Sequence, residues 1–224
     1  MSILIKKVLI IPDGHRRYAN LHSIDYESSY ILGAETAAEL VKECLYSKTV
    51  THLAFFPLAS KNFKERNCSN LSFIFSALKK FIVSVEPVLG NNINIKYRGS
   101  LNRLPKDEKK MIEKLVKNKC CKNEPQMTLE LLIDYDGAEE LRNLSSIEIE
   151  KKLSFPFDIV VRTGGSFRLS GSPVECLEAD MFCLDVMFPD IRFNHLLKIF
   201  NKYNDDKDRR ALLRGKNNIS HNVF

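Results

Sequence analysis

The sequence predicts one α/β domain with a central, mostly parallel six-stranded sheet flanked by helices. Two observations carry this prediction. Six short runs rich in β-branched and aromatic residues are spread over the chain, and segments with helical spacing lie between them. Strands that alternate with helices favour a parallel sheet, because each helix returns the chain to the same end of the sheet. With 224 residues, 44% of them hydrophobic, the chain can bury one sizeable core.

The expected elements follow in chain order. The strands are expected at Val8 to Ile11, His52 to Phe56, Ile93 to Tyr97, Leu129 to Ile133, Phe157 to Val161 and Cys183 to Phe188. Residues 33–47 and 71–85 repeat apolar residues at helical spacing, and Pro105 suits the first turn of a third helix that ends near Lys117. We treat residues 1–224 as a single domain whose charged end frays over its last ~15 residues.

Composition excludes several classes of protein. The net charge of +6, from 34 Lys and Arg against 28 Asp and Glu, favours an anionic ligand but falls short of a nucleic-acid-binding surface. Six cysteines without C-x-x-C spacing indicate reduced thiols of a cytoplasmic protein. The apolar runs are only strand-sized, so we expect no signal peptide and no membrane span. Neither G-x-G-x-x-G nor G-x-x-x-x-G-K-[ST] occurs, which disfavours a nucleotide-binding module.

Polar residues follow the first expected strand. There, Asp13, Arg16 and Arg17 surround the turn at Gly14, and a helix is expected next. The free N–H groups and positive dipole of a helix N-terminus suit a phosphate group. Asp13 could hold Mg²⁺ against that phosphate, because this ion binds one or two carboxylates plus phosphate oxygens. A capped turn with solvated arginines is the alternative interpretation.

A second polar segment follows the strand that ends near Val161. Arg162 is followed by the turn 163–165, Thr-Gly-Gly, whose backbone can approach a ligand closely, and then by Arg168 and Ser170. Two arginines and a hydroxyl group on one turn make a fork-like site for a diphosphate. A hairpin with surface arginines is disfavoured, because an unpaired Arg162 at the end of an apolar strand would be costly.

Two further segments carry weaker signals. After the second expected strand, Asn62 could hydrogen-bond a reacting group, and Lys64 or Arg66 could reach a phosphate; an ordinary loop is the alternative. In residues 180–190, carboxylates such as Asp180 could complete a metal site with Asp13, or could be caps and solvated edge residues.

Together the four segments resemble the cis-prenyltransferase family, the undecaprenyl diphosphate synthase-like enzymes. The family patterns D-G-N-x-R-W-A, S-x-N-[WF] and R-T-G-G-x-x-R-x-S are matched by residues 13–19, 60–63 and 162–170. The closing pattern E-x-x-F-x-x-x-x-W-P-D is similar to residues 180–190, with Asp180 in place of Glu and Phe188 in place of Trp. The four patterns occur in family order.

The resemblance implies a homodimer with an apolar tunnel and two diphosphate sites bridged by Mg²⁺. The implied reaction transfers a prenyl group from an allylic diphosphate to a second isoprenoid diphosphate and releases diphosphate. The expected ligands are dimethylallyl diphosphate and, in the regular reaction, isopentenyl diphosphate. The implied catalytic residues are Asp13, Arg17 and Asn62, the implied metal ligands are Asp13 and Asp180, and the implied substrate-binding residues are Gly14, His15, Arg16, Arg17, Tyr18, Tyr26, Tyr30, Arg66, Arg162, Arg168 and Ser170.

Several residues depart from the pattern of chain-elongating members. Tyr26 and Tyr30 stand where those members have Arg and His, His15 replaces an Asn, Lys61 replaces a Glu, and residues 171–176 replace an aromatic run. These changes are more similar to the irregular branch, the lavandulyl and cyclolavandulyl diphosphate synthases, which join two C5 units head-to-middle. We therefore expect a short-chain or irregular product.

Two alternatives stay open. One is regular cis elongation with isopentenyl diphosphate, and the other is a non-catalytic partner subunit, which has no physical need to retain Asp13, Asn62 and Arg162. For the aromatic residues we expect core packing and not tunnel lining at Phe55, Phe73, Phe75 and Phe81.

Overall fold

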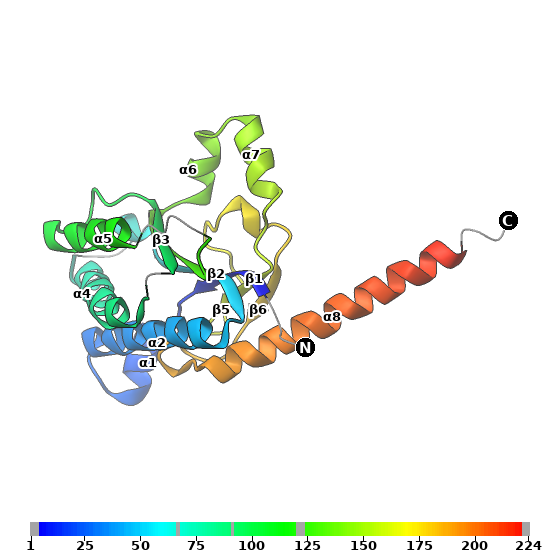
Figure 1. The fold of residues 1–224 in the computed structure, drawn as a ribbon. Helices are drawn as coiled ribbons and strands as arrows, with labels where there is room; N and C mark the ends of the chain where they lie inside the picture. Colours follow the sequence, from blue (N-terminus) through cyan, green and yellow to red (C-terminus); the bar gives the residue numbers. More distant parts are fainter. Residues whose placement is uncertain (1–4, 66–67, 91, 120–123, 221–224) are drawn as a thin grey trace.

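The computed structural model describes residues 5–65, 68–90, 92–119 and 124–220 (Figure 1). Six strands form one sheet in the order β3-β4-β2-β1-β5-β6, and every neighbouring pair is parallel. The strands are β1 (Ile5–Ile11), β2 (Val50–Ala59), β3 (Ile93–Gly99), β4 (Met127–Tyr135), β5 (Ile159–Arg162) and β6 (Asp180–Cys183). The predicted fold class is confirmed, and the sheet is parallel throughout.

Helices connect the strands on both faces of this sheet. They are α1 (His15–His22), α2 (Tyr26–Ser47), α3 (Asn62–Glu65), α4 (Cys68–Val85), α5 (Lys106–Asn118), α6 (Gly137–Arg142), α7 (Ser146–Leu153) and α8 (Phe193–Ser220), with 3-10 turns η1 (Glu86–Val88), η2 (Val174–Cys176) and η3 (Phe188–Asp190). The second half of α8 extends away from the body of the molecule (Figure 1). In the described residues, every helix is too short or too polar to span a bilayer.

Two elements differ from their expected positions. Helix α2 begins at Tyr26 and not at Gly33, because the Asp25 carboxylate caps it by accepting a hydrogen bond from the Ser28 N–H at 2.8 Å. Strand β6 ends at Cys183, where the sequence predicted that a strand begins, and Phe188 lies instead at the start of η3 with Pro189 behind it.

The two faces of the sheet bury different cores. Alternate strand residues such as Val8 and Ile10 pack under α2, α4, α5 and α8 in the larger cluster. On the opposite face, Leu9 and Ile11 belong to a smaller cluster, beside ion pairs that Arg98 makes with Glu140 (2.6 Å) and Glu175 (2.9 Å).

The polar segments of the sequence meet at one edge of the sheet. Ile11 at the end of β1 is in register with Arg162 at the end of β5, and β2 ends beside them at Ala59. Ligands of parallel sheets bind at the carboxyl ends of the strands. The fold therefore places the first three segments at the edge where a ligand site is expected, and the end of the fourth reaches the same edge, because the Phe188 N–H donates to the Asp13 carbonyl.

Candidate active site

Asp13 lies at the centre of this edge, directly after β1. The Thr163 hydroxyl accepts a hydrogen bond from the Asp13 N–H at 2.9 Å and donates one to the Asp13 carbonyl at 2.8 Å. The Phe188 N–H also donates to that carbonyl, at 3.0 Å. Since Thr163 is fully buried, the backbone of Asp13 is held in place from the side of β5.

The Asp13 carboxylate is surrounded by donors. Its Oδ2 accepts from Arg162 Nη2 at 2.6 Å, its Oδ1 accepts from the Gly14 N–H at 2.7 Å, and Arg17 Nη2 lies 3.4 Å from Oδ1. Burial by itself raises the pKa of Asp13, but the hydrogen bond and charge of Arg162, with smaller contributions from Gly14 and Arg17, lower the pKa below its ordinary value. The group is therefore a carboxylate at neutral pH.

Arg162 links Asp13 to Arg168 and Ser170, at the end of the motif that Arg162 begins. The guanidinium is 5% exposed and donates from Nη1 to the Arg168 carbonyl and to Ser170 Oγ, both at 2.5 Å. Its Nε is buried and has no hydrogen-bond partner among the described residues. Ser170 has a left-handed backbone, with φ +56°, which turns the chain back toward Arg162. The buried charge expected at Arg162 is thus paired with Asp13.

The Thr-Gly-Gly turn pairs with the segment after β6. The Gly164 N–H donates to the Val186 carbonyl and the Gly165 N–H to the Leu184 carbonyl, both at 2.8 Å, so these amides hold the segment after β6. The amides of this turn are therefore paired within the chain, and close approach of its backbone to a ligand stays a prediction. Gly164, at φ +75°, is needed for another reason, because a Cβ there would lie 2.5 Å from Arg17 Nη2.

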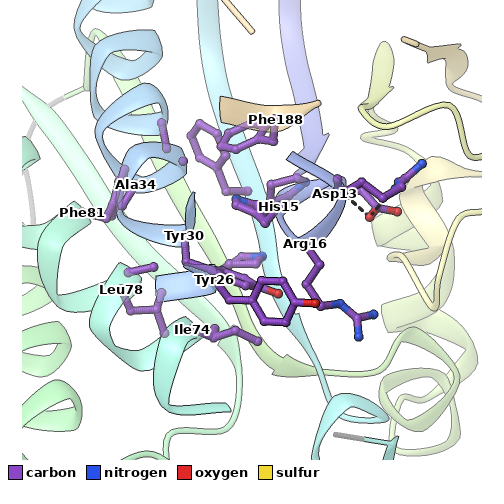
Figure 2. Close-up of a pocket in the computed structure, with 18 of the residues that line it drawn as sticks. Asp13, His15, Arg16, Tyr26, Tyr30, Ala34, Ile74, Leu78, Phe81 and Phe188 are labelled. Carbon is purple, nitrogen blue, oxygen red and sulfur yellow. Dashed lines mark hydrogen bonds and ion pairs between the residues drawn. The ribbon is translucent and has the colours of Figure 1, made fainter. Parts of the chain in front are cut away.

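Two cavities adjoin Asp13. The first has a volume of about 410 Å³ and the second about 280 Å³, and Pro12, Asp13, Arg16 and Pro57 line both. Figure 2 shows the first cavity, with Asp13 and Arg16 at one end and Ala34, Leu78 and Phe81 at the other. The first is lined also by Gly14, His15, Arg17, Asn20, Tyr26, Tyr30, Gly33, Ala37, Phe55, Ile74, Ala77, Leu131 and Phe188. The remaining residues of the second are Ile11, Phe56, Ala59, Lys61, Asn62, Glu65, Asn70, Arg162, Arg168 and Ser170.

Aromatic rings shape the first cavity. The His15 ring stacks on Tyr30, with centroids 4.5 Å apart and planes 5° apart. A Cβ at Gly33 would lie 2.3 Å from His15 Nε2, so glycine at that position of α2 lets the histidine fit. Tyr26 also lines this cavity, so phenol rings occupy the wall where chain-elongating members carry Arg and His.

The expected division of the phenylalanines needs correction. Phe55 and Phe81 are buried in the core, as predicted, but they also line the first cavity. Phe73 and Phe75 pack against the larger core. A residue on the inner face of a helix or strand can pack in the core and line a cavity when the cavity lies inside the core. The periodicity of a sequence does not reveal whether such a cavity exists.

Two predicted site residues lie elsewhere, and a third is not among the described residues. Asp180 begins β6 in register with Ile159, three positions before the strand ends near Asp13, which is roughly 10 Å along a parallel strand. Within one chain the Asp180 and Asp13 carboxylates therefore do not share a metal ion. The Tyr18 ring lies 4.1 Å from His22 and lines neither cavity. Arg66 lies outside the described residues.

Some lining residues were not predicted. Lys61 and Glu65 contribute to the second cavity, and their place around Asn62 in a polar segment after a strand was the available signal. Asn20 and Asn70 also line the cavities, and no sequence pattern marks either as a ligand-binding residue. The Asn62 side chain is oriented by the backbone, because its Oδ1 accepts from the Ala59 N–H at 3.0 Å.

Comparison with known proteins identifies the family. The family model described as "Putative undecaprenyl diphosphate synthase" matches residues 11–211, which include all four motif segments. The chain belongs to this family. A curated isoprenyl transferase of Campylobacter jejuni is 25% identical over 218 residues, covering 89% of this chain and 95% of the relative. The family resemblance inferred from the motifs is confirmed, and the chain is a prenyltransferase of this family.

Further relatives and solved structures agree. A tritrans,polycis-undecaprenyl-diphosphate synthase (geranylgeranyl-diphosphate specific) of Thermoplasma volcanium is 24% identical over 224 residues, covering 88% of this chain and 85% of the relative. The lavandulyl diphosphate synthase of Lavandula x intermedia, crystallised with dimethylallyl diphosphate, superposes with a TM-score of 0.77 at 20% identity, covering 90% of this chain and 95% of that one. A probable undecaprenyl diphosphate synthase of Campylobacter jejuni gives 0.67 at 21% identity, covering 91% and 96%. These two likenesses concern the fold.

Proposed function

We propose that this prenyltransferase joins short isoprenoid diphosphates, with dimethylallyl diphosphate as donor, and forms a short-chain or head-to-middle product. The observation that carries the proposal is the first cavity, where Tyr26 and Tyr30 line the wall that is cationic in chain-elongating members. Its volume of about 410 Å³ lies toward the lower end of the roughly 300–1,000 Å³ typical of small-molecule pockets.

In this proposal the first cavity binds the donor. Gly14, Arg16 and Arg17, together with the N–H groups that begin α1, would hold its diphosphate, and the apolar walls would take the prenyl group. Negative charge develops on the diphosphate as the allylic C–O bond breaks. Guanidinium groups and helix N–H groups stabilise that charge before the reaction starts and need no rearrangement, which lowers the barrier.

The second cavity would bind the acceptor. Arg162, Arg168 and Ser170 would hold its diphosphate, and the wall shared at Asp13 would bring the acceptor double bond close to the donor carbon. The C–C bond forms as the C–O bond breaks, diphosphate leaves, and a proton is lost from the acceptor. Asn62 would assist at the position where the proton or the diphosphate departs.

The residues at Asp13 fit a magnesium ion. In the described residues no three Asp, Glu, His or Cys side chains gather into a metal site, whereas Mg²⁺ needs only one or two carboxylates beside phosphate oxygens. Asp13, held as a carboxylate by Arg162, would hold the ion against a bound diphosphate. The ion would supply positive charge to the departing diphosphate.

We further propose a homodimer in the cytoplasm. Large apolar side chains are exposed on α7 and η2, which pack together: Ile147 is 77% exposed, and Leu177, just after η2, is 70% exposed. Burying such a patch against a second copy would remove apolar surface from water. Light scattering on the purified protein measures the oligomeric state, and a monomer would contradict this part of the proposal.

Regular cis elongation is the second candidate function. The names of the curated relatives favour it, since several are undecaprenyl diphosphate synthases. A non-catalytic partner subunit is disfavoured, because the hydrogen bonds from Asp13 through Arg162 to Ser170 are complete.

A substrate panel with Mg²⁺ distinguishes these functions. Purified protein is incubated with dimethylallyl diphosphate alone, then with isopentenyl diphosphate plus dimethylallyl, geranyl or farnesyl diphosphate, and dephosphorylated products are identified by mass spectrometry. A branched or cyclic C10 alcohol from dimethylallyl diphosphate alone is expected. Linear products that require isopentenyl diphosphate would establish regular elongation, and no product in any mixture would favour the partner-subunit function.

A further inference from the structure

One wall of the second cavity is a short segment outside the sheet. It consists of Ser60, Lys61 and the single-turn helix α3, and it contributes Lys61, Asn62 and Glu65 to the lining. A helix of one turn has little stability of its own. Contacts from elsewhere in the chain must therefore hold this wall. They come from β4, from the segment after β3, and from α4, where the Phe75 ring centre lies 6.3 Å from that of Phe63.

The first contact is between Ser60 and the end of β4. The Ser60 N–H donates to the Tyr135 carbonyl at 3.0 Å, and the Ser60 hydroxyl donates to Asp134 Oδ1 at 2.9 Å. Asp134 is 5% exposed and has a left-handed backbone with φ +48°. This conformation is uncommon for residues other than glycine but is tolerated by Asp and Asn.

The second contact comes from Arg103. Its Nε donates to Asp134 Oδ2 at 2.8 Å and its Nη2 donates to Asp134 Oδ1, so the guanidinium binds the carboxylate with two bonds. The guanidinium carbon also lies 4.0 Å from the centre of the Phe63 ring, within the range of a cation–π contact. Arg103 and Asp134 thus hold the wall at Ser60 and at Phe63, on both sides of Lys61 and Asn62.

We propose that Arg103 and Asp134 are positioning residues that hold the Ser60–Glu65 wall and thereby set how the second cavity binds its diphosphate ligand. Neither residue is among those that line the first or the second cavity, and neither belongs to the motifs that marked the site. The assignment of this ligand as the acceptor rests on the proposed function. The claim that these residues hold the wall does not rest on the proposed function, so either claim can fail without the other.

The contacts predict graded effects of substitution. Arg103→Ala removes both the fork on Asp134 and the contact with Phe63, whereas Arg103→Lys keeps the charge but cannot reproduce the planar fork. Ser60→Ala removes the hydrogen bond from the Ser60 hydroxyl to Asp134. Asp134→Asn tests the carboxylate without adding backbone strain, since Asn also adopts left-handed φ. Arg142→Ala is the matched control, because Arg142 is an exposed arginine that bonds the Ala138 carbonyl of its own helix.

The experiment combines hydrogen exchange with steady-state kinetics. In Arg103→Ala we expect amide exchange of residues 60–65 to rise about tenfold, which corresponds to about 1.4 kcal/mol, because the hydrogen bonds to Asp134 and the contact with Phe63 are lost. We expect the acceptor KM to rise by a similar factor, a donor KM within twofold of the unsubstituted protein, a smaller effect in Arg103→Lys, and no effect in Arg142→Ala. Because Ser60 and Arg103 act on the same carboxylate, the double variant should lose less than the two single losses combined.

Several results would overturn the proposal. Unchanged exchange at residues 60–65 in folded Arg103→Ala would show that the wall does not depend on the arginine. Equal rises in donor and acceptor KM would indicate general loss of structure, and so would failure of Arg103→Lys to recover any function. If Arg103→Ala does not fold, Ser60→Ala and Asp134→Asn decide by the same criteria. If the unsubstituted protein turns over no substrate pair, the proposed function fails. The exchange measurement still tests whether Arg103 and Asp134 hold the Ser60–Glu65 wall.

Discussion

The two cavities that meet at Asp13 differ in how they are prepared for a diphosphate. In the second, Arg162 is buried and its guanidinium is already fixed by Asp13 and Ser170. In the first, Arg17 is exposed but its guanidinium already donates to the Gly164 carbonyl at 2.6 Å, Arg16 is exposed, and the rest of the wall is largely apolar or aromatic. A fixed guanidinium loses little freedom when a ligand binds, whereas an exposed side chain such as Arg16 must be ordered by the ligand.

The difference also separates what the chain shares with its family from what it changes. Arg162, Arg168 and Ser170, which match the R-T-G-G-x-x-R-x-S pattern, line the second cavity, while the departures His15, Tyr26 and Tyr30 line the first. The division is not complete, because Lys61 departs from the pattern and lines the second cavity, whereas Gly14 and Arg17 match the pattern and line the first. Under the proposed function, the second cavity retains recognition of the common diphosphate, and the aromatic wall of the first alters the choice of prenyl group.

Removing the shared carboxylate should have the largest effect. We expect Asp13→Ala to lower kcat by about 1,000-fold or more, since it removes the carboxylate that we propose holds Mg²⁺ and leaves the Arg162 guanidinium without its partner. Steady-state kinetics and circular dichroism measure activity and folding together. Asp107→Ala, at an exposed aspartate of α5, is the control. Near-normal turnover in the folded Asp13 variant would remove this residue from the mechanism.

A change confined to the second cavity should separate the two sites. We expect Arg168→Ala to raise the acceptor KM or lower kcat by more than about tenfold, because charge-assisted hydrogen bonds to a diphosphate are lost, while the donor KM stays the same. Initial rates with each substrate varied in turn give both constants. Unchanged kinetics would show that Arg168 does not contact the acceptor.

A charge added to the first cavity should alter donor choice. We expect Tyr26→Arg to raise kcat/KM for geranyl or farnesyl diphosphate relative to dimethylallyl diphosphate by about fivefold, if the missing cation limits longer donors. Tyr46→Arg adds the same charge to an exposed position of α2 and is the control. The same donor preference in both variants would show that cavity shape decides it.

The smallest effect concerns the titration of Asp13. Its pKa lies below the ordinary value of 3.8, so the stability that its ionised form contributes is complete above 3.8 and is lost as pH falls through the pKa of the folded protein. Arg162→Gln removes the charge that lowers this pKa, and the Asp13 midpoint should therefore rise. Carboxyl carbon NMR measures it, with Arg142→Gln as control. A midpoint that does not move would assign the low pKa to other groups.

Sequence reasoning recovered the local chemistry and missed much of what depends on strand order. The runs that formed β1 and β5 were visible, and so were the polar residues after them, but the 2.6 Å bond between Arg162 and Asp13 depends on these strands being neighbours. The prediction that Asp180 shares a metal site with Asp13 depended on strand order in the same way. The position of Asp180 along β6 is set by its register with Ile159 and not by its motif.

The start of α2 and the residues that hold the Ser60–Glu65 wall were also not predicted. The apolar spacing predicted a helix only from Gly33, yet α2 begins at Tyr26 and runs through Gly33, where the His15 ring lies against the helix backbone. Arg103 and Asp134 lie in segments without a motif, and only their contacts with Ser60 and Phe63 connect them to the site.

The wall at Pro12, Asp13, Arg16 and Pro57 has a thermodynamic consequence, because it belongs to both cavities. An anion bound on one side changes the charge that an anion meets on the other, so the two binding free energies are linked. Reciprocity then requires that the factor by which the first ligand changes the affinity for the second equals the factor in the opposite direction. Binding in one cavity is therefore coupled to binding in the other, whichever ligand arrives first.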